Sequence, residues 1–274
     1  MVSKEGMDFD HHHFKDKQKK ALGHVVDVPE LGGTYSLLSQ EVFTIKRARL
    51  LDQETHHIDI FGQGWVFFYA LSKKGEISVV RDGARIFLGQ QIMGYIPGKS
   101  VVEWVLPKGE IEFELLVSEI PLSRGAPDKA ICVNYSDDTK NLFELFAQFF
   151  ENFPELPQKQ LSRCSNPTEL SFRVQEWIHL NWRTNFKIND LAKHMNKDIS
   201  VISRYFKRSF GLSPLKYVNQ LRVITSVRDL LKSQRSISQI SYDMGFGDPR
   251  LFNEHFRKIY PVKPFAFKRL KNID

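Results

Sequence analysis

Cysteine is scarce in this sequence, and long apolar runs are absent. Its 274 residues include two cysteines, Cys132 and Cys164, which are too few for a disulfide framework and lack the spacing of a zinc site. No apolar stretch reaches the roughly 18 residues that a membrane-spanning helix needs. Residues 1–20 are charged and His-rich, unlike a secretory signal, and we expect them to be disordered. These absences favour a cytoplasmic protein with reduced thiols and no membrane partner.

Recognisable catalytic patterns are also missing. A cupin-type metal site needs two or three histidines and a carboxylate inside a barrel, but only His56 and His57 lie near predicted strands. Neighbours on a strand point to opposite faces, so both cannot point inward. There is no phosphate loop, Ser-His-Asp order or carboxylate pair. We expect no catalytic residue, metal or cofactor, although a cupin-type metalloenzyme with a DNA-binding appendage remains the alternative that metal analysis would test.

The charge is divided unevenly along the chain. Residues 1–167 contain 19 Lys and Arg against 23 Asp and Glu, whereas residues 168–274 contain 20 against 9. Positive charge confined to one part of a chain is typical of proteins that bind a polyanion. No basic helix has a free apolar face for a membrane surface, so double-stranded DNA is the favoured partner.

The basic part contains an internal repeat. The motif Tyr205-Phe206-Lys207-Arg208 returns fifty residues later as His255-Phe256-Arg257-Lys258. At the same offset of fifty residues the copies also pair Asp198 with Asp248, Ile202 with Phe252, Pro214 with Pro264, and Tyr217 with Phe267. Upstream the offset is forty-nine residues, and it pairs Ile188 with Ile237, Leu191 with Ile240, Ala192 with Ser241, and Met195 with Met244. A fixed period indicates duplicated supersecondary units. Each unit reads as two short helices around a turn.

Within the first unit, apolar residues define the buried side of each helix. Ile188, Leu191, Ala192 and Met195 follow helical spacing, a turn follows, and Asp198 or Ser200 can cap the next helix. That helix turns Ile202 and Phe206 inward and ends at Gly211. Its outer face carries Ser200, Val201, Ser203, Arg204, Lys207 and Arg208. A helix with a basic front and an apolar back suits the major groove of DNA.

A long helix is expected between the two copies. No glycine or proline interrupts the chain after Pro214 until beyond Lys232, and the apolar residues follow helical spacing. Nineteen residues at 1.5 Å each span about 28 Å. Such a rod could hold two DNA-contacting helices about one turn of DNA apart, roughly 34 Å.

From about residue 170 to 269 the chain resembles the DNA-binding domain of AraC/XylS-type bacterial transcription regulators. The resemblance is carried by Arg204-Tyr-Phe206-Lys207, Phe210-Gly-Leu-Ser-Pro214, Ile237-Ser-Gln-Ile240, Gly245-Phe246-Gly-Asp248 and Phe252-Asn-Glu-His-Phe256-Arg257. It implies seven helices, two helix-turn-helix units and contact with two adjacent major grooves. Glu254 departs from the usual Arg, which weakens phosphate attraction at the second helix.

The DNA contacts are expected to divide by role. Arg204 and Ser203 contact bases with help from Ser200 and Val201, while Arg250 and Asn253 do so from the second helix. Lys207, Arg208, Arg257 and Lys258 mostly hold phosphates, which position the protein without specifying sequence. Glu254 can accept a hydrogen bond from a cytosine amino group.

The amino-terminal half is predicted to be a β-barrel or sandwich. Short apolar strands alternate with turns, and Asp82-Gly83 between two strands predicts a type I′ hairpin. Strand rhythm and the Tyr95-Ile-Pro97-Gly98 turn resemble the cupin-like sensor domain that precedes the DNA-binding domain in this family. The aromatic residues Trp65, Phe67, Tyr69, Tyr95 and Trp104 either line an effector cavity or fill the core.

A helix over residues 138–153 closes this domain. Asp137 or Asp138 can cap it, Pro154 stops it, and an apolar stripe runs through Leu142, Leu145, Phe146, Phe149 and Phe150. The stripe packs on the barrel, forms a dimer seam, or does both. Residues 154–167 read as a linker.

The sequence thus predicts an α+β protein with three parts: a cupin-like sensor and dimerisation domain (1–153), a linker (154–167) and an all-α DNA-binding domain (168–274). We expect a sequence-specific transcription regulator that responds to an effector through its first domain. The expected partners are promoter DNA, RNA polymerase, a small-molecule effector and a second copy of the chain. An architectural DNA binder without effector control is the other alternative.

Overall fold

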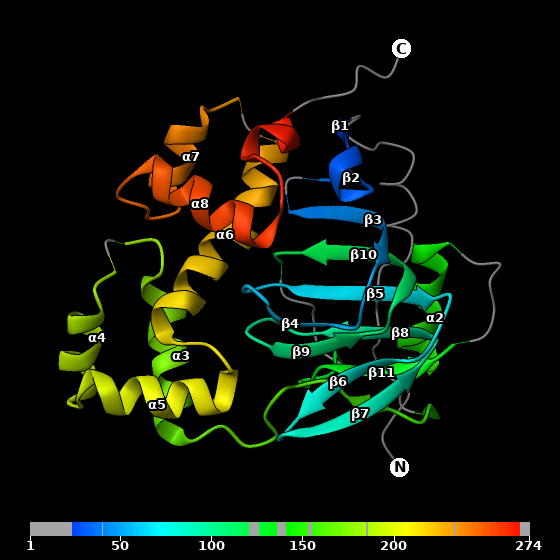
Figure 1. Ribbon diagram of the computed structural model, residues 1–274, viewed down its shortest axis with the longest axis horizontal. Coiled ribbons are helices and arrows are strands. Elements are labelled where there is room, and N and C mark those ends of the chain that lie inside the picture. Colours follow the sequence, from blue (N-terminus) through cyan, green and yellow to red (C-terminus); the bar gives the residue numbers. More distant parts are fainter. Residues whose placement is uncertain are drawn as a thin grey trace.

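The computed structural model describes residues 24–39, 41–120, 126–135, 141–152, 155–184, 186–232 and 234–268. The expected disorder of residues 1–20, the cap at Asp137 or Asp138, the stop at Pro154 and the end of the helix at residue 153 lie outside these ranges. Figure 1 shows a β-sandwich on one side of the molecule and a group of helices on the other, with helix α6 running between them.

The amino-terminal part is a sandwich of two antiparallel sheets. The large sheet has the order β1-β2-β3-β10-β5-β8-β11-β12 and the small one has the order β4-β9-β6-β7. The strands of the large sheet are β1 (His24–Val28), β2 (Gly33–Leu37), β3 (Val42–Leu51), β5 (Trp65–Ser72), β8 (Gln91–Ile96), β10 (Gly109–Ser118), β11 (Ile131–Asn134) and β12 (Lys159–Gln160). Those of the small sheet are β4 (Thr55–Ile60), β6 (Ile77–Arg81), β7 (Ala84–Gly89) and β9 (Val101–Leu106). A short 3-10 helix, η1 (Pro29–Leu31), joins β1 to β2.

The predicted hairpin is confirmed. Strands β6 and β7 pair from Arg81 and Ala84 outward, and the two turn residues have φ values of 51° at Asp82 and 84° at Gly83. A type I′ turn requires positive φ at both central residues, and Asp-Gly meets that requirement.

Helix α2 (Leu142–Asn152) lies against the large sheet. The side chain of Asn141 accepts from the backbone N–H groups of Phe143 and Glu144, at 3.1 Å each, and so caps the helix. The five residues of the apolar stripe are all buried in one cluster with strands β5 and β8. Packing on the sandwich is therefore the observed role of the stripe.

The segment expected to be a linker is attached to the sandwich along part of its length. Strand β12 pairs with β11, and Leu161 is fully buried. The backbone N–H of Arg163 donates to the carbonyl of Val101 at 2.9 Å. This attachment places Arg163 between the two halves of the molecule.

The carboxy-terminal part is all helical and contains the seven helical elements expected, within its described residues. They are α3 (Glu169–Asn181), α4 (Ile188–Met195), α5 (Ile199–Phe210), α6 (Pro214–Lys232), α7 (Ile237–Asp243), α8 (Pro249–Ile259) and the 3-10 helix η3 (Pro264–Lys268). The long helix α6 has the predicted bounds. Leu215, an apolar residue in its first turn, is 49% exposed.

Candidate nucleic-acid interface

The first helix-turn-helix unit is built from α4 and α5. Leu191 and Met195 bury the inner face of α4, and Asn196 ends that helix in the left-handed conformation at φ 50°. Asp198 occupies the N-cap of α5, although its side chain makes no capping hydrogen bond. Gly211 ends α5 at φ 76°, a conformation that favours glycine.

The second unit, α7 and α8, is built in the same way. Ser236 and Gln239 form a capping box at the start of α7, and the side chain of Asp248 accepts from the backbone N–H of Arg250 at 2.7 Å to cap α8. Phe252 and Phe256 are fully buried beneath α8, as Ile202 and Phe206 are beneath α5.

Equivalent aromatic pairs pack beneath α5 and α8 in the two units. Phe206 meets Tyr217 edge to face with ring centroids 5.4 Å apart and an interplanar angle of 87°. Phe256 meets Phe267 at 5.5 Å and 82°. The four residues occupy matching places in the sequence repeat, so the duplication seen in the sequence is a duplication of packing geometry.

Helix α6 is joined to the segment that follows α3 by a buried arginine that the apolar pattern did not reveal. The guanidinium of Arg222 donates to the main-chain carbonyls of Trp182 at 2.7 Å and Thr184 at 2.8 Å. Burial lowers the pKa of Arg222 to about 10. An arginine inside an apolar stripe gives no periodic signal, since its role depends on which carbonyls lie opposite.

The outer face of α5 is open to solvent. Ser200, Arg204, Lys207 and Arg208 are exposed, and Val201 and Ser203 are partly exposed. The Arg204 guanidinium carbon lies 5.3 Å from the ring centroid of Tyr205, which orients the side chain along the helix. All six predicted contact residues of the first unit thus share one accessible surface.

The outer face of α8 is equally accessible. Arg250, Glu254, Arg257 and Lys258 are exposed, and Asn253 is partly exposed. The amide nitrogen of Asn253 donates to the carbonyl of Pro249 at 2.9 Å. One donor of Asn253 is therefore engaged within its own helix, which leaves Arg250 as the less encumbered group for base contacts.

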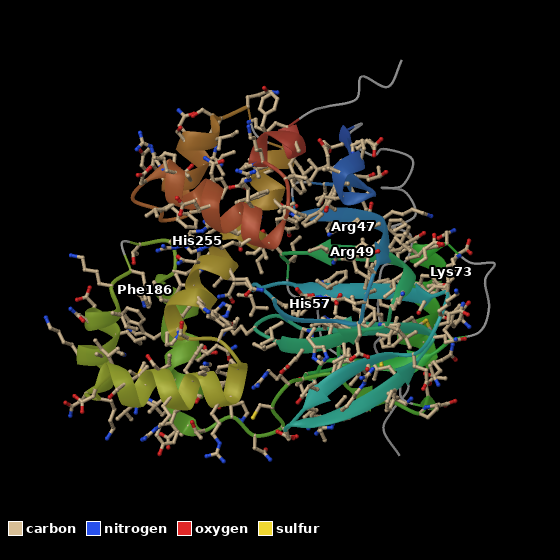
Figure 2. All side chains as sticks on the ribbon, viewed as in Figure 1. Arg47, Arg49, His57, Lys73, Phe186 and His255 are labelled. Carbon is tan, nitrogen blue, oxygen red and sulfur yellow. The ribbon has the colours of Figure 1, made fainter. Side chains whose placement is uncertain are left out.

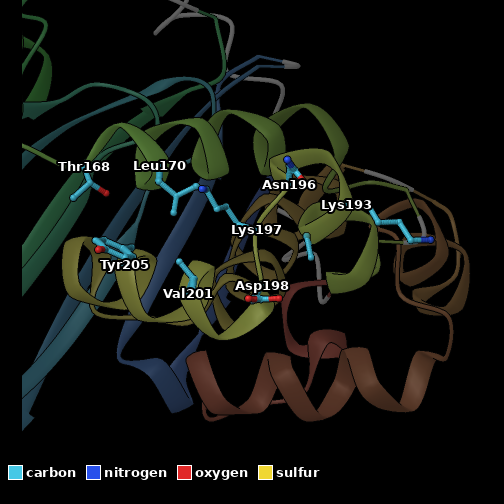
Figure 3. A pocket seen from close by; sticks show the side chains of 9 residues that line it. Thr168, Leu170, Lys193, Asn196, Lys197, Asp198, Val201 and Tyr205 are labelled. Carbon is cyan, nitrogen blue, oxygen red and sulfur yellow. The ribbon is translucent and has the colours of Figure 1, made fainter.

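A groove of about 800 Å³ runs beside α5. In Figure 3 the side chains of Val201 and Tyr205 on α5 face Thr168 and Leu170 at the start of α3, with Lys197 nearby. The groove was not predicted from the sequence, because residues of three different helices form its walls. It lies in the helical part of the molecule, away from the sandwich.

The sandwich contacts helices that adjoin both units. Lys99 forms an ion pair of 2.8 Å with Glu176 on α3, and the side-chain amide of Gln220 on α6 donates to the carbonyl of Ile58 at 2.8 Å. At the other end, Tyr35 meets Phe267 with ring centroids 4.8 Å apart. The outer faces of α5 and α8 remain exposed among the described residues.

The five aromatics expected to line one cavity lie in two different layers. Trp65, Phe67 and Tyr95 are buried under α2, where Trp65 stacks on Phe146 with centroids 5.3 Å apart. Tyr69 packs against the same layer, whereas Trp104 lies between the sheets, 5.7 Å from Phe68. Trp65, Phe67 and Tyr69 are alternate residues of β5 and so share the face toward α2, whereas Trp104 comes from the small sheet and points between the two sheets. The five side chains therefore do not converge on one cavity.

The described residues contain neither a cluster suited to a metal ion nor a helix suited to a membrane. No group of three or more His, Cys, Asp or Glu is placed to hold a metal ion there. Nor is any helix in those ranges long and apolar enough to cross a membrane.

The comparisons with known proteins agree with this geometry. Residues 191–270, which span most of α4 through η3, match a family described as a helix-turn-helix domain. The "Lactose operon transcription activator" of Staphylococcus xylosus is 23% identical over 93% of this chain and 86% of its own length. The helical domain is of the AraC/XylS type. The protein is accordingly a DNA-binding transcription regulator and not an enzyme.

Other relatives match about half of this chain or less. The "Msm operon regulatory protein" of Streptococcus mutans is 30% identical over 47% of this chain, and the match spans 45% of that relative. Among solved structures, ToxT from Vibrio cholerae is similar over 85% of this chain and all of its own, with a TM-score of 0.52 and 11% identity. This AraC/XylS-type chain therefore shares the two-part fold of ToxT.

Proposed function

We propose that α5 and α8 enter successive major grooves of double-stranded DNA. Arg204 and Ser203 contact bases from α5, with Ser200 and Val201 beside them, and Arg250 and Asn253 contact bases from α8. The observation that carries this proposal is the pair of exposed, basic helix faces mounted on equivalent aromatic pairs.

The remaining cations hold the DNA backbone. Lys207, Arg208, Arg257 and Lys258 lie toward the carboxyl ends of the two helices, where they meet phosphates. Glu254, exposed among them, lowers this attraction at the second unit and accepts from a cytosine amino group.

Residues 1–153 form the sensing domain, 154–167 the connection and 168–274 the DNA-binding domain. An effector acts through the first of these, because the sandwich contacts α3, α6 and η3, which adjoin the two helix-turn-helix units, and so influences the relative placement of the units. A ToxT structure with a TM-score of 0.51 to this chain contains a bound unsaturated fatty acid, which supports effector binding in this architecture.

The protein acts in the cytoplasm and activates transcription together with RNA polymerase. Several relatives, including the first one above and RhaS of Pectobacterium carotovorum, are described as transcription activators. A homodimer would present four units to DNA, but the stripe on α2 is buried, so its seam would need another surface.

Selection of DNA sites from a random pool tests the proposal. The full chain should enrich one motif with two conserved blocks about one helical turn apart. Arg204→Ala should relax the base preference in one block and Arg250→Ala that in the other. Each substitution should cost roughly 1–3 kcal/mol of binding free energy. Lys216→Ala, which removes an exposed cation on α6 rather than on α5 or α8, is the control. Unchanged motifs for both arginine variants would show that these residues do not contact bases.

A further inference from the structure

Two arginines lie side by side where the sandwich meets the last helices. Arg47 and Arg49 alternate on β3 with the exposed Lys46 and Ala48, so both point from the same face of the strand. Figure 2 shows them one below the other, between the sandwich and the carboxy-terminal helices. The charge of Arg47 reaches Tyr260, at the end of α8. The pair therefore belongs to the junction of the two parts.

These guanidiniums have few acceptors among the described residues. Arg49 is half-buried and makes neither a hydrogen bond nor a direct ion pair with any described residue. Arg47 reaches only the carbonyl of Leu31, through a long contact of 3.4 Å, and lies beside the Tyr35 hydroxyl. That hydroxyl is fully buried and finds no acceptor for its proton among the described residues. Buried polar groups are nearly always hydrogen-bonded. The buried Tyr35 hydroxyl, the unpaired guanidinium of Arg49 and the remaining N–H groups of Arg47 thus leave several donors at one place for a ligand.

The surrounding charges leave the place positive. Asp59 on β4 is the acidic group whose charge reaches Arg49, but its carboxylate lies 3.3 Å from His57 Nε2 and is 45% exposed. Burial, then the charge of Arg47, lowers the pKa of Arg49. Nδ1 of His57 is also buried without a partner. One carboxylate thus faces two guanidiniums and an imidazole.

The backbone beside Arg47 is shaped to hold its side chain. Gly33 on β2 pairs with Arg47 across the sheet. A Cβ at Gly33 would lie 2.4 Å from Cγ of Arg47, so only glycine lets the arginine stem lie flat against β2. This close approach fixes where the guanidinium stands.

We propose that Arg47, Arg49 and Tyr35 bind the carboxylate or phosphate group of a small organic effector. Each guanidinium offers paired N–H donors that match the geometry of such oxyanions, and the phenol adds a third donor. A ligand here touches β2 and β3 of the sandwich and lies near Phe267 and Tyr260 behind the second helix-turn-helix unit. The inference rests on the proposal that the sandwich senses an effector, and it names the ligand class.

Thermal unfolding of the full chain in sodium phosphate, sodium acetate and sodium chloride at equal ionic strength tests the site. Phosphate or acetate should raise Tm saturably, by about 5 °C or more at a hundredfold excess over Kd, while chloride should not. The anion that gives the larger rise in Tm shows whether the site prefers a phosphate or a carboxylate group. Arg49→Gln and Arg47→Gln should abolish the rise. Lys46→Gln, on the opposite face of the same strand and paired with Glu114, should retain it. No saturable rise, or an equal rise in all variants, overturns the proposal.

A second measurement distinguishes the site from its regulatory use. Affinity for the selected DNA motif should change about fivefold or more when the effective oxyanion is added to the wild-type chain, and not at all for Arg49→Gln. Binding of the anion without any change in DNA affinity would leave the site standing and contradict effector control. Loss of sequence-specific DNA binding in the wild type would instead contradict the proposed DNA contacts.

Discussion

The guanidinium of Arg163 donates a hydrogen bond of 3.0 Å to the main-chain carbonyl of Arg208, near the carboxyl end of α5. It donates equally to the carbonyl of Ser209, and its Nε lies 2.6 Å from the Glu103 carboxylate on β9. A positive charge at a helix carboxyl end is favourable, since the last carbonyls have no partner within the helix. The segment between the domains therefore ties α5 directly to the sandwich.

Replacing Arg163 should weaken DNA binding through α5 alone. Arg163→Met is expected to lower affinity about threefold to tenfold, and the loss should be less than additive with that of Arg204→Ala. When Arg163→Met is combined with Arg250→Ala on α8, the two losses of binding free energy should add. Fluorescence anisotropy on the selected DNA motif measures this. The control is Arg81→Met, whose guanidinium contacts Ser165 but not α5. Additive losses with both partners would mean that Arg163 does not position α5.

Lys207 should contribute to affinity without contributing to sequence preference. Lys207→Ala removes one exposed cation from α5, so it should weaken binding to all sequences by a similar factor. The slope of log affinity against log salt should flatten by about one. Titrations at several salt concentrations measure the slope. A changed motif would instead assign Lys207 to base contacts.

Gly211 should be intolerant of a side chain. Its φ of 76° disfavours other residues, and an added Cβ would lie 2.4 Å from Cδ1 of Ile58 on the sandwich. Gly211→Ala is expected to lower the free energy of unfolding by more than about 1 kcal/mol. Gly247→Ala is the matched control, because no atom lies within 4 Å of its added Cβ. Denaturant unfolding compares them, and equal effects would contradict the close approach at Gly211.

Stability should fall on mild acidification because of His179. This imidazole is buried, its Nε2 lies 2.9 Å from the Tyr217 hydroxyl, and burial, with a smaller effect of the Lys99 charge, lowers the pKa of His179 to about 4. The unfolded chain, with a pKa near 6.5, binds a proton first, so stability is full above that value. It is lost as the pH falls toward 4, by about 3 kcal/mol.

His179→Gln should flatten this dependence relative to the wild type between pH 7 and pH 4.5. The measurement is Tm at each pH for both chains, since carboxylates contribute equally to the two and cancel in the difference. Parallel curves would show that His179 does not titrate as described.

The sequence predicted the local structure well where short-range chemistry decides it. Asp82-Gly83 specified its turn, Pro214 and Lys232 bounded the long helix, and the repeat anticipated that Phe206 and Phe256 are equivalent. These features depend on turn conformation and helical spacing, which neighbouring residues determine.

Contacts between distant segments were not predictable in this way. Arg222, Arg163 and Arg49 look alike as isolated cations in the sequence, yet one is buried against carbonyls, one bridges the domains and one has no acceptor among the described residues. The aromatics of β5, β8 and β9 were grouped by type, but those of β5 and β8 face α2, whereas Trp104 on β9 belongs to the other sheet and points between the sheets. Only the tertiary arrangement shows what faces each side chain.

Hydroxyl-radical footprinting of the full chain on its selected DNA site tests the central claim most directly. If α5 and α8 occupy successive major grooves, protection should fall in two windows about one helical turn apart on one face of the duplex. Arg204→Ala should weaken the protection in one window, and Arg250→Ala should weaken it in the other. A single protected window, or protection that neither substitution alters, would contradict the account.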